Sequence, residues 1–401
     1  MSDLFHEQLT ALRARSLYRT LREIGTAQGP QVRIAGCELV NFSSNDYLGL
    51  ANDERLRAAA TAAIAEFGVG AGASRLISGT QSPHVRLENA LAQWKGTPAA
   101  ICFSSGYATA IGTIPALARK QDVVVLDKLC HASLIDGAKL SGATLRVFPH
   151  NHLGKLESHL EWARRERPDG RVVIVTESVF SMDGDRAPLR ELIDLKKRFG
   201  ALLLLDEAHA IGVIGAHGRG LAADLGVEAE VDAQMGTLSK ALGVSGGYVC
   251  GSASLIEWLV NRARPFIFST APPAALAAAA LAAVEFVASA EGEARRRSLW
   301  ERIQFLRANL PRSVAIDPDP SHPTSSSNGS AIHPWLIGDE QATLDVSRAL
   351  QKKGFLVPAI RYPTVAKGSA RLRITVTATH HDAQILDLCE AISRQADRTQ
   401  P

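Results

Sequence analysis

The sequence is poor in cysteine and aromatic residues and has no long apolar run. Its five cysteines are widely spaced and include no Cys-x-x-Cys pair, so we expect a reducing compartment and neither a disulfide framework nor a thiolate metal site. Aromatic residues make up only 5% of the chain, which leaves few side chains to stack on nucleic acid bases. The most apolar stretch, residues 274–284, is shorter than the about 20 residues that span a membrane. The N-terminal residues lack the apolar core of a signal peptide, and we therefore expect a cytoplasmic protein that binds no membrane.

Positive charge is not in excess either, because 44 Lys and Arg residues stand against 41 Asp and Glu residues, a net charge of +3. A basic stripe is the usual mark of a nucleic-acid-binding surface, so we expect no nucleic acid partner. Hydrophobic residues make up 46% of the 401 residues, which is enough for a large core. At roughly 150 residues per domain, this length predicts two to three domains, or one large domain with a smaller one.

Short apolar runs alternate with helical patterns through the middle of the chain. The apolar runs predict buried strands at residues 99–103, 123–126, 145–148, 172–175, 202–205 and 248–250. Helical patterns separate most of them, at residues 85–95, 108–119, 153–165 and 189–198. Strands that are apolar throughout and alternate with helices predict an α/β fold with a mostly parallel sheet.

Both ends of the chain differ from this pattern. The first 35 or so residues predict a helix with apolar positions Leu9, Leu12, Leu17 and Leu21, followed by a turn and a strand at residues 38–42. Residues 274–310 predict one long helix, and residues 318–330 predict a loop. The remainder predicts strands at 332–337, 355–357 and 372–376, with helices at 343–353 and 383–394. We therefore place a large domain at residues 45–283, and we expect residues 1–44 to join residues 284–401 in a smaller α+β domain.

Three motifs match known signatures but lack the required context. Asp206-Glu-Ala-His209 matches the DEAH box of helicases, yet the chain has no phosphate-binding G-x-x-x-x-G-K-[ST] loop. Residues 243–247 match G-x-S-x-G around Ser245, but a serine hydrolase needs a strand before the serine, whereas here the strand follows. The glycines of residues 68–73 resemble a dinucleotide-binding loop, but no strand precedes them.

Two histidine pairs, His150 with His152 and His380 with His381, suggest metal binding at first sight. Neither pair has the i, i+4 spacing of helical metal ligands or a third ligand nearby. We expect surface histidines and no metal site.

An acid and a lysine carry the strongest chemical signal. Asp206 ends the apolar run 202–205, and the carboxyl ends of parallel strands are where α/β sheets bind ligands. Lys240 follows among hydroxyl-bearing and small residues, in Thr237-Leu-Ser-Lys-Ala-Leu-Gly243. A partly desolvated lysine forms a Schiff base with an aldehyde, and a buried acid suits a cationic heteroaromatic ring. Together they predict a pyridoxal phosphate (PLP) site, with a turn aspartate and an exposed loop lysine as the structural alternatives.

Two further segments agree with such a site. Residues 104–108, Ser-Ser-Gly-Tyr-Ala, lie between a predicted strand and a predicted helix, and the N–H groups of a helix N-terminus bind phosphate. The alternative is a plain helix cap, for which Ser104 or Ser105 would serve. His131 follows another predicted strand and is a candidate to stack on the ring of PLP; by itself it would be a packing or capping residue.

These segments resemble the α-oxoamine synthases, fold-type-I PLP enzymes that condense an amino acid with an acyl-CoA and release CO₂. Six stretches carry the resemblance in the expected order over nearly the whole chain: residues 41–49, 70–79, 131–134, 179–185, 206–215 and 360–365. The resemblance implies a large, mostly parallel seven-stranded domain with a smaller α+β domain, and a homodimer with active sites at the subunit interface.

The resemblance also implies roles for single residues. Lys240 would hold PLP covalently, Asp206 would keep its ring nitrogen protonated, and His131 would stack on the ring and face the substrate. The other residues expected to bind the cofactor are Ser181 and His209 near the ring hydroxyl and Gly106, Tyr107, Thr237 and Ser239 at the phosphate. The residues expected to bind substrate are Asn45, Thr364, Arg361 as carboxylate ligand, and Arg19 or Arg22 at the acyl substrate.

Within the family, the signature implies a branch that condenses L-alanine with a pimeloyl thioester, carried by CoA or by an acyl carrier protein. Tyr362 beside Pro363 departs from that branch and is similar to enzymes that use glycine and acetyl-CoA. Family members that use glycine with acetyl-CoA or succinyl-CoA therefore stay open. A PLP-binding module of a regulator is the non-enzymatic alternative, but it needs a DNA-binding extension for which the 401 residues leave no room.

Overall fold

The computed structural model describes residues 2–311, 313–314 and 329–399. The chain divides into two compact units. Unit 1 comprises residues 1–47, 182–184 and 298–401, and unit 2 comprises residues 48–181 and 185–297. The boundaries lie at 47/48 and 297/298, whereas the sequence pattern places them at 44/45 and 283/284.

A seven-stranded sheet forms the centre of unit 2, with the strand order β3-β9-β8-β7-β6-β4-β5. The strands are β3 (Ala99–Phe103), β4 (Val123–Asp127), β5 (Thr144–Phe148), β6 (Val172–Glu177), β7 (Leu202–Asp206), β8 (Ala233–Thr237) and β9 (Gly247–Gly251). Neighbours from β5 to β8 are parallel, and β9 runs antiparallel to both β8 and β3. The predicted α/β fold with a mostly parallel sheet is confirmed. The apolar runs do not predict β8, because Gln234, Gly236 and Thr237 interrupt its apolar character.

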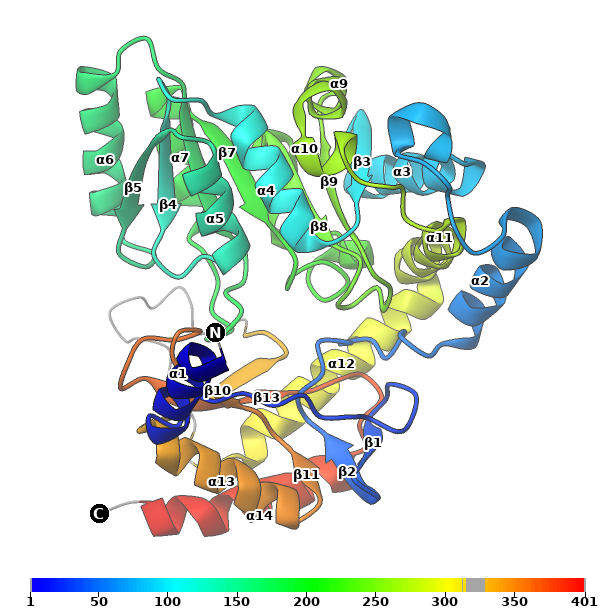
Figure 1. Cartoon of the computed structure of the whole chain (residues 1–401), viewed down its shortest axis with the longest axis vertical. Helices are drawn as coiled ribbons and strands as arrows, with labels where there is room; N and C mark the ends of the chain where they lie inside the picture. The colour runs from blue at the N-terminus through cyan, green and yellow to red at the C-terminus, as the bar shows by residue number, and fades with distance from the viewer. Residues whose placement is uncertain (1, 312, 315–328, 400–401) are drawn as a thin grey trace. The chain divides into compact units, whose positions relative to one another are not determined.

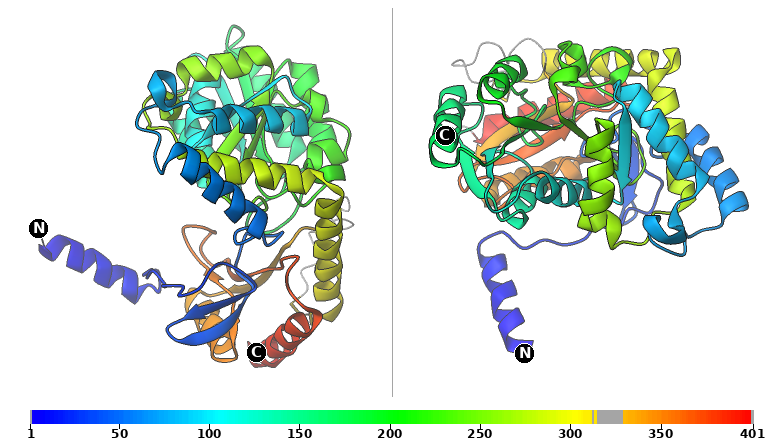
Figure 2. Two further views of the ribbon diagram at one scale, coloured as in Figure 1. Left: turned by 90° about the vertical axis from the view of Figure 1, so that its right-hand side faces the viewer. Right: turned by 90° about the horizontal axis from the view of Figure 1, so that it is seen from above.

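Helices connect these strands. The helical segments of unit 2 are α2 (Glu54–Phe67), η1 (Arg75–Gly79), α3 (Ser82–Lys95), α4 (Gly106–Leu117), α5 (Ala132–Leu140), α6 (Leu153–Glu166), α7 (Leu189–Phe199), η2 (Ala216–Gly218), α8 (Leu221–Asp224), η3 (Glu228–Glu230), α9 (Ala253–Arg262), α10 (Arg264–Ile267) and α11 (Ala274–Ala288). Figure 1 shows α4 and α5 packed side by side against the sheet, and Figure 2 shows α2 lying along α11.

The core of unit 2 lies between the sheet and these helices. Strand residues such as Val124, Val173 and Leu204 are completely buried, because the middle strands of a parallel sheet are covered on both faces. Their packing against α4 and α5 holds the carboxyl edge of the sheet, where β6 and β7 end in Glu177 and Asp206.

Unit 1 contains two small sheets and its own apolar core. One sheet has the order β1-β2-β11 and the other β10-β13-β12. The elements are α1 (Ser2–Ala14), β1 (Gln31–Ile34), β2 (Cys37–Asn41), α12 (Ala290–Asn309, which starts in unit 2), β10 (Ile332–Gly338), α13 (Glu340–Lys352), β11 (Phe355–Leu356), β12 (Ala359–Ile360), β13 (Ala370–Thr375) and α14 (Asp382–Thr399). Phe42, Trp335, Leu372 and Ile385 are among the buried side chains that hold it together.

Two helix predictions were wrong in extent. The N-terminal helix ends at Ala14 instead of including Leu17 and Leu21, because Ser16 adopts a left-handed conformation with φ 54° that interrupts it. The stretch 274–310 is two helices, since Ser289 is extended and its hydroxyl accepts the N–H of Gly292 at 3.2 Å as a cap for α12. The predicted loop at 318–330 lies, up to residue 328, outside the described residues.

The same break bears on membrane insertion. Over the described part of the chain, no single helix is both long and apolar enough to cross a membrane, and α11 and α12 meet that test only as a pair bent by 76°.

Candidate active site

Asp206 lies at the carboxyl edge of the unit 2 sheet, where the sequence pattern places it. It ends β7 and is only 6% exposed. Its Oδ1 accepts the backbone N–H of Ala208 at 2.9 Å. Burial raises the pKa of Asp206, while the positive charge of Lys240 opposes that rise. A buried carboxylate of this kind favours a cationic partner that replaces its lost hydration.

Lys240 approaches the same edge from the loop that follows β8. The loop is closed by a hydrogen bond from the Leu238 N–H to the Gly246 carbonyl at 2.9 Å. It turns through Gly243, whose φ is 68° and where an added Cβ would lie 2.5 Å from the Ala51 nitrogen, so only glycine fits there. The Nζ of Lys240 lies 2.9 Å from Nε2 of His209, which stands in the turn after Asp206. Two of the predicted cofactor residues are thus in direct contact.

His131 is the N-cap of α5. Its Nδ1 accepts the Ser133 N–H at 3.3 Å and lies 2.8 Å from the Ser133 hydroxyl. With Nδ1 occupied as an acceptor, the hydrogen bonds assign the imidazole proton to Nε2. Burial of part of the ring and the charge of Lys240 lower the pKa of His131. The lowered pKa favours the neutral ring, which can donate through Nε2.

A hydroxyl-lined cradle lies at the start of α4. Ser105 caps that helix by accepting the Ala108 N–H at 3.0 Å, which leaves the first N–H groups of α4 directed outward. Thr237 and Ser239 place their hydroxyl oxygens 2.9 Å apart. An added Cβ on Gly106 would lie 3.6 Å from the Thr237 hydroxyl oxygen, so the hydroxyl faces the helix N-terminus. Backbone N–H groups and hydroxyls at a helix N-terminus form an anion site.

Glycine is needed next to this cradle. An added Cβ on Gly247 would lie 2.8 Å from the Cα of Gly106, so a side chain there would push β9 away from α4. The side chain of Tyr107 is exposed and donates its hydroxyl to Asp136 at 2.7 Å. If Tyr107 binds a phosphate, it therefore does so through its backbone N–H.

Ser181 and the turn that carries His209 complete the edge. Ser181 is buried and follows β6. Its segment is joined to β7 by Ser178, whose N–H donates to the Asp206 carbonyl at 2.9 Å. His209 is also buried. A buried acid, an amine, an imidazole and an anion cradle on one sheet edge are the donor set that PLP requires, so these residues fit the cofactor.

Apart from His131, the residues expected to bind substrate belong to unit 1. Asn45 accepts a hydrogen bond from Nη1 of Arg373 at 3.0 Å. The guanidinium of Arg361 donates to the Ser16 carbonyl, and the Thr364 N–H donates to the Arg361 carbonyl at 3.0 Å. Nη2 of Arg19 lies 3.3 Å from the Tyr362 carbonyl.

This last contact separates the two N-terminal arginines. Arg19 is bonded to the 361–364 turn, whereas the side chain of Arg22 is exposed.

Comparison with known proteins identifies the family. The sequence profile of the class I and II aminotransferases matches residues 38–392. An 8-amino-7-oxononanoate synthase of Geobacter sulfurreducens is 46% identical over 387 residues, which cover 96% of each chain. The chain belongs to the 8-amino-7-oxononanoate synthase family. The resemblance to the α-oxoamine synthases is thereby confirmed.

Other relatives and solved structures agree. An 8-amino-7-oxononanoate synthase of Anaeromyxobacter dehalogenans is 48% identical, covering 96% of this chain and 93% of the relative. A serine palmitoyltransferase of S. paucimobilis with bound PLP and myriocin has a TM-score of 0.90 at 29% identity, covering 99% of this chain and 98% of that chain. The 8-amino-7-oxononanoate synthase of Francisella tularensis has a TM-score of 0.74 at 27% identity, covering 90% of this chain and 98% of that chain.

The sequence did not point to two residues, Glu177 and Arg373, that the structure places beside predicted site residues. Glu177 ends β6 beside Asp206 in the register of the sheet, and its carboxylate accepts the backbone N–H of His131. Arg373 lies in β13 and is only 4% exposed. The signal for Glu177 was its position, an acid directly after an apolar strand, as for Asp206. Arg373 carries no such signal, because the sequence does not show that it contacts Asn45.

Two histidines expected at the surface are not there. The ring of His150 is half-buried between Asp127, at 3.1 Å, and Asp185, at 2.7 Å. His380 is 1% exposed and stacks on Phe42 with ring centroids 4.3 Å apart. Both ring nitrogens of His150 have carboxylate partners, and Nδ1 of His380 accepts the Thr377 N–H at 3.0 Å. Hydrogen bonds of this kind are what a buried polar ring needs. The described residues contain no group of three or more His, Cys, Asp or Glu side chains that could hold a metal ion.

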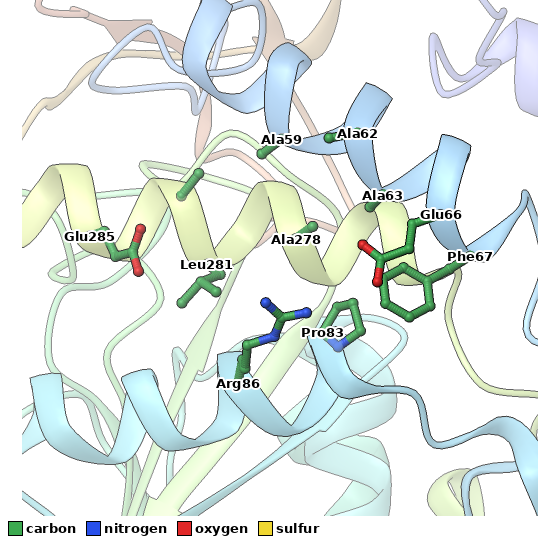
Figure 3. Close-up of a pocket in the computed structure, with 11 residues that line it drawn as sticks. Ala59, Ala62, Ala63, Glu66, Phe67, Pro83, Arg86, Ala278, Leu281 and Glu285 are labelled. Carbon is green, nitrogen blue, oxygen red and sulfur yellow. The ribbon is translucent and has the colours of Figure 1, made fainter.

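One pocket lies away from these residues. It has a volume of about 230 Å³ and is lined by residues of α2 and α11, about half of them alanines, together with Pro83 and Arg86 of α3. Figure 3 shows Arg86 between α3 and α11, with Glu66 and Glu285 at either end of the pocket. None of the predicted site residues lines it, so it is separate from the sheet edge described above.

Proposed function

We propose that this chain catalyses the decarboxylative condensation of L-alanine with a pimeloyl thioester to give 8-amino-7-oxononanoate, the free thiol and CO₂. The observation that carries the proposal is the contact of Lys240 with His209 beside the buried carboxylate of Asp206, in a chain 44–48% identical over nearly its full length to enzymes of that name. PLP, bound through Lys240, supplies an electron sink for the negative charge that develops at the amino acid Cα.

Lys240 acts as the base of the reaction once the amino acid has displaced it from the cofactor. Its Nζ takes the proton from Cα, a task that requires the free amine. The imidazole of His209, 2.9 Å away, can accept a hydrogen bond from that amine and so holds the amine in one position.

Asp206 and His131 have complementary tasks. The carboxylate of Asp206 holds a proton at the pyridine nitrogen, because a buried anion is stabilised by the adjacent cation. His131 offers its Nε2–H to an oxygen of the substrate, since Nδ1 is engaged by Ser133. Thr237, Ser239 and the N-terminal N–H groups of α4, at Gly106 and Tyr107, bind the phosphate, and Ser181 with His209 bonds the ring hydroxyl.

The amino acid carboxylate needs an arginine. Arg361 is the arginine expected from the sequence, but its guanidinium donates to the Ser16 carbonyl. Arg373 is more deeply buried and donates to Asn45, which is itself expected to face the substrate. These contacts support Arg373 with Asn45 as the carboxylate site. Thr364 and Arg361 then belong with Arg19 at the acyl substrate, and the bond between Arg19 and the 361–364 turn supports Arg19 over Arg22 for that task.

A substrate panel tests the reaction. The purified protein is assayed with L-alanine or glycine against pimeloyl-CoA, pimeloyl carrier protein, acetyl-CoA and succinyl-CoA. We expect alanine with a pimeloyl thioester to have the highest kcat/KM. One methyl group gives only about 1–3 kcal/mol of discrimination, so most of the preference should come from the acyl chain. If glycine with acetyl-CoA is used best, Tyr362 is the better guide and the proposal fails.

The homodimer with interface active sites and the cytoplasmic location also remain proposals. Exposed apolar side chains support a dimer: in unit 2, Leu76 is 49%, Ile77 81% and Phe268 70% exposed. Such side chains together mark an interaction surface. Light scattering should give twice the mass of one chain, and Ile77→Asp should shift the equilibrium toward the monomer.

A further inference from the structure

Glu177 is a buried acid that the proposed reaction does not use. It is the last residue of β6 and is 3% exposed. In the sheet register it lies opposite Asp206, the last residue of the neighbouring parallel strand β7. Side chains opposite each other on neighbouring strands point to the same face of a sheet. Two carboxyl groups are therefore held side by side at this edge.

The carboxylate of Glu177 has a specific partner. Its Oε1 accepts the backbone N–H of His131, the first residue of the turn into α5. That N–H lies beyond the end of β4 and has no strand neighbour to bond. The Glu177 carboxyl is buried, and a buried polar group without a partner is costly. This bond therefore ties the turn that carries His131 to the end of β6.

Other side-chain contacts hold the same turn from both sides. Asp127 accepts the Leu129 N–H at 2.8 Å, and the ring of His131 accepts the Ser133 N–H at 3.3 Å. Between these two bonds, Glu177 is the acceptor for the N–H of His131, the residue expected to stack on the cofactor. The length of the Glu177 side chain matters, because its oxygen must extend from the end of β6 to an N–H of the turn.

The charges around Glu177 show that its carboxyl does not need to be ionised for this task. Burial is the largest cause that raises the pKa of Glu177, and the charges of Asp206 on β7 and Asp127 on β4 raise it further. Lys240 and the His131 N–H lower the pKa of Glu177. The net result is a pKa of about 8. A protonated carboxyl still accepts a hydrogen bond through its carbonyl oxygen.

We propose that Glu177 is a positioning residue of the condensation, which holds the imidazole of His131 in place through the backbone amide that it accepts. The proposal rests on the proposed function. In this role the length of the Glu177 side chain, which brings an acceptor oxygen to the His131 N–H, matters more than its charge. A purely electrostatic role would instead depend on the charge.

Two substitutions separate reach from charge. Glu177→Gln keeps the length and an acceptor oxygen but cannot ionise. Glu177→Asp keeps an ionisable carboxyl group but withdraws the oxygen by one methylene. Thr176→Val is the matched control, because Thr176 is the neighbouring residue of β6 and is 1% exposed. All three are prepared as PLP-loaded full-length protein, and their melting temperatures are compared with wild type.

The first readout is kinetic, with alanine and pimeloyl-CoA. We expect Glu177→Asp to lower kcat by about 10- to 100-fold, as for the loss of one buried hydrogen bond, with KM changed less than about threefold. Glu177→Gln and Thr176→Val should stay within about threefold of wild type in kcat.

The second readout does not depend on activity. In protein labelled with ¹⁵N-histidine, the amide resonance of His131, assigned with His131→Asn, should move upfield in Glu177→Asp and stay in place in Glu177→Gln and Thr176→Val. Wild-type kcat in Glu177→Asp, an unmoved resonance in that variant, or an equal loss in Glu177→Gln would overturn the proposal. If the wild type does not condense alanine with pimeloyl-CoA while the resonance behaves as expected, the proposed function fails and the hydrogen bond stands.

Discussion

The amine of Lys240 and the imidazole of His209 lie within a hydrogen bond of each other, 2.9 Å from Nζ to Nε2. The two residues come from different loops, one after β8 and one after β7. Parallel neighbouring strands end at the same edge of a sheet, and this is why two side chains 31 positions apart meet. The carboxyl edge of the sheet is thus what brings the amine and the imidazole of the candidate site together.

Replacing Lys240 by Ala should remove the covalent cofactor link. The variant should fold and lose the visible absorbance of the aldimine, because Lys240 is the amine whose charge acts on the buried Asp206. Borohydride reduction of the wild type, followed by peptide mapping, should place the pyridoxyl group on Lys240. A label on another lysine would contradict the assignment.

Asp206→Asn should preserve the fold but lower kcat by about 100-fold or more. The Asn side-chain oxygen still accepts the Ala208 N–H that Oδ1 of Asp206 accepts at 2.9 Å, so local structure survives. A neutral amide, however, does not hold a proton at the pyridine nitrogen. Melting temperature and cofactor content serve as controls, and near-normal turnover would show that Asp206 has another role.

Arg373→Lys should raise KM for alanine by about tenfold or more, because lysine keeps the charge but loses the planar donors that a carboxylate binds in pairs. Arg361→Ala should instead raise KM for pimeloyl-CoA more than for alanine. The reverse pattern would restore Arg361 as the ligand of the amino acid carboxylate, as the sequence suggests.

His150→Gln should lower the free energy of unfolding by about 1–3 kcal/mol at pH 7. Burial alone would lower the pKa of His150, but hydrogen bonds to Asp127 and Asp185 outweigh it and raise the pKa to about 10. The folded state then binds the proton more tightly than the unfolded state, whose pKa is near 6.5.

This linkage sets the direction of the pH effect. The stabilisation by protonated His150 is fully present below about pH 6.5 and is lost as the pH rises to about 10. Urea unfolding between pH 6 and 10 should therefore show a steeper loss of stability in the wild type than in His150→Gln. The exposed His6→Gln variant is the control and should match the wild type. Parallel curves for wild type and His150→Gln would contradict the prediction.

Several features of this molecule depend on short-range sequence signals. Apolar runs such as 123–126 and 202–205 predict buried strands because a strand covered on both faces must be apolar at every position. The pairing of Asp206 with Lys240 is likewise predicted, since an acid at the end of a strand and a lysine among hydroxyls each have a recognisable local pattern. The two helix predictions that were wrong in extent also have local causes. The backbone conformation of Ser16 ends the first helix, and the hydroxyl of Ser289 caps the start of α12.

Contacts between distant segments were decided only by the tertiary structure. Four such contacts join residues far apart in the chain. They are the register of Glu177 opposite Asp206, the bond of Glu177 to the His131 amide, the contacts of His150 with two aspartates and the bond of Arg373 to Asn45. The sequence around a polar residue shows that its side chain needs a hydrogen-bond partner, but it does not show which residue is that partner. That depends on where the sheet edge and the turns bring the second residue, because hydrogen bonds and ion pairs act only over a few ångströms.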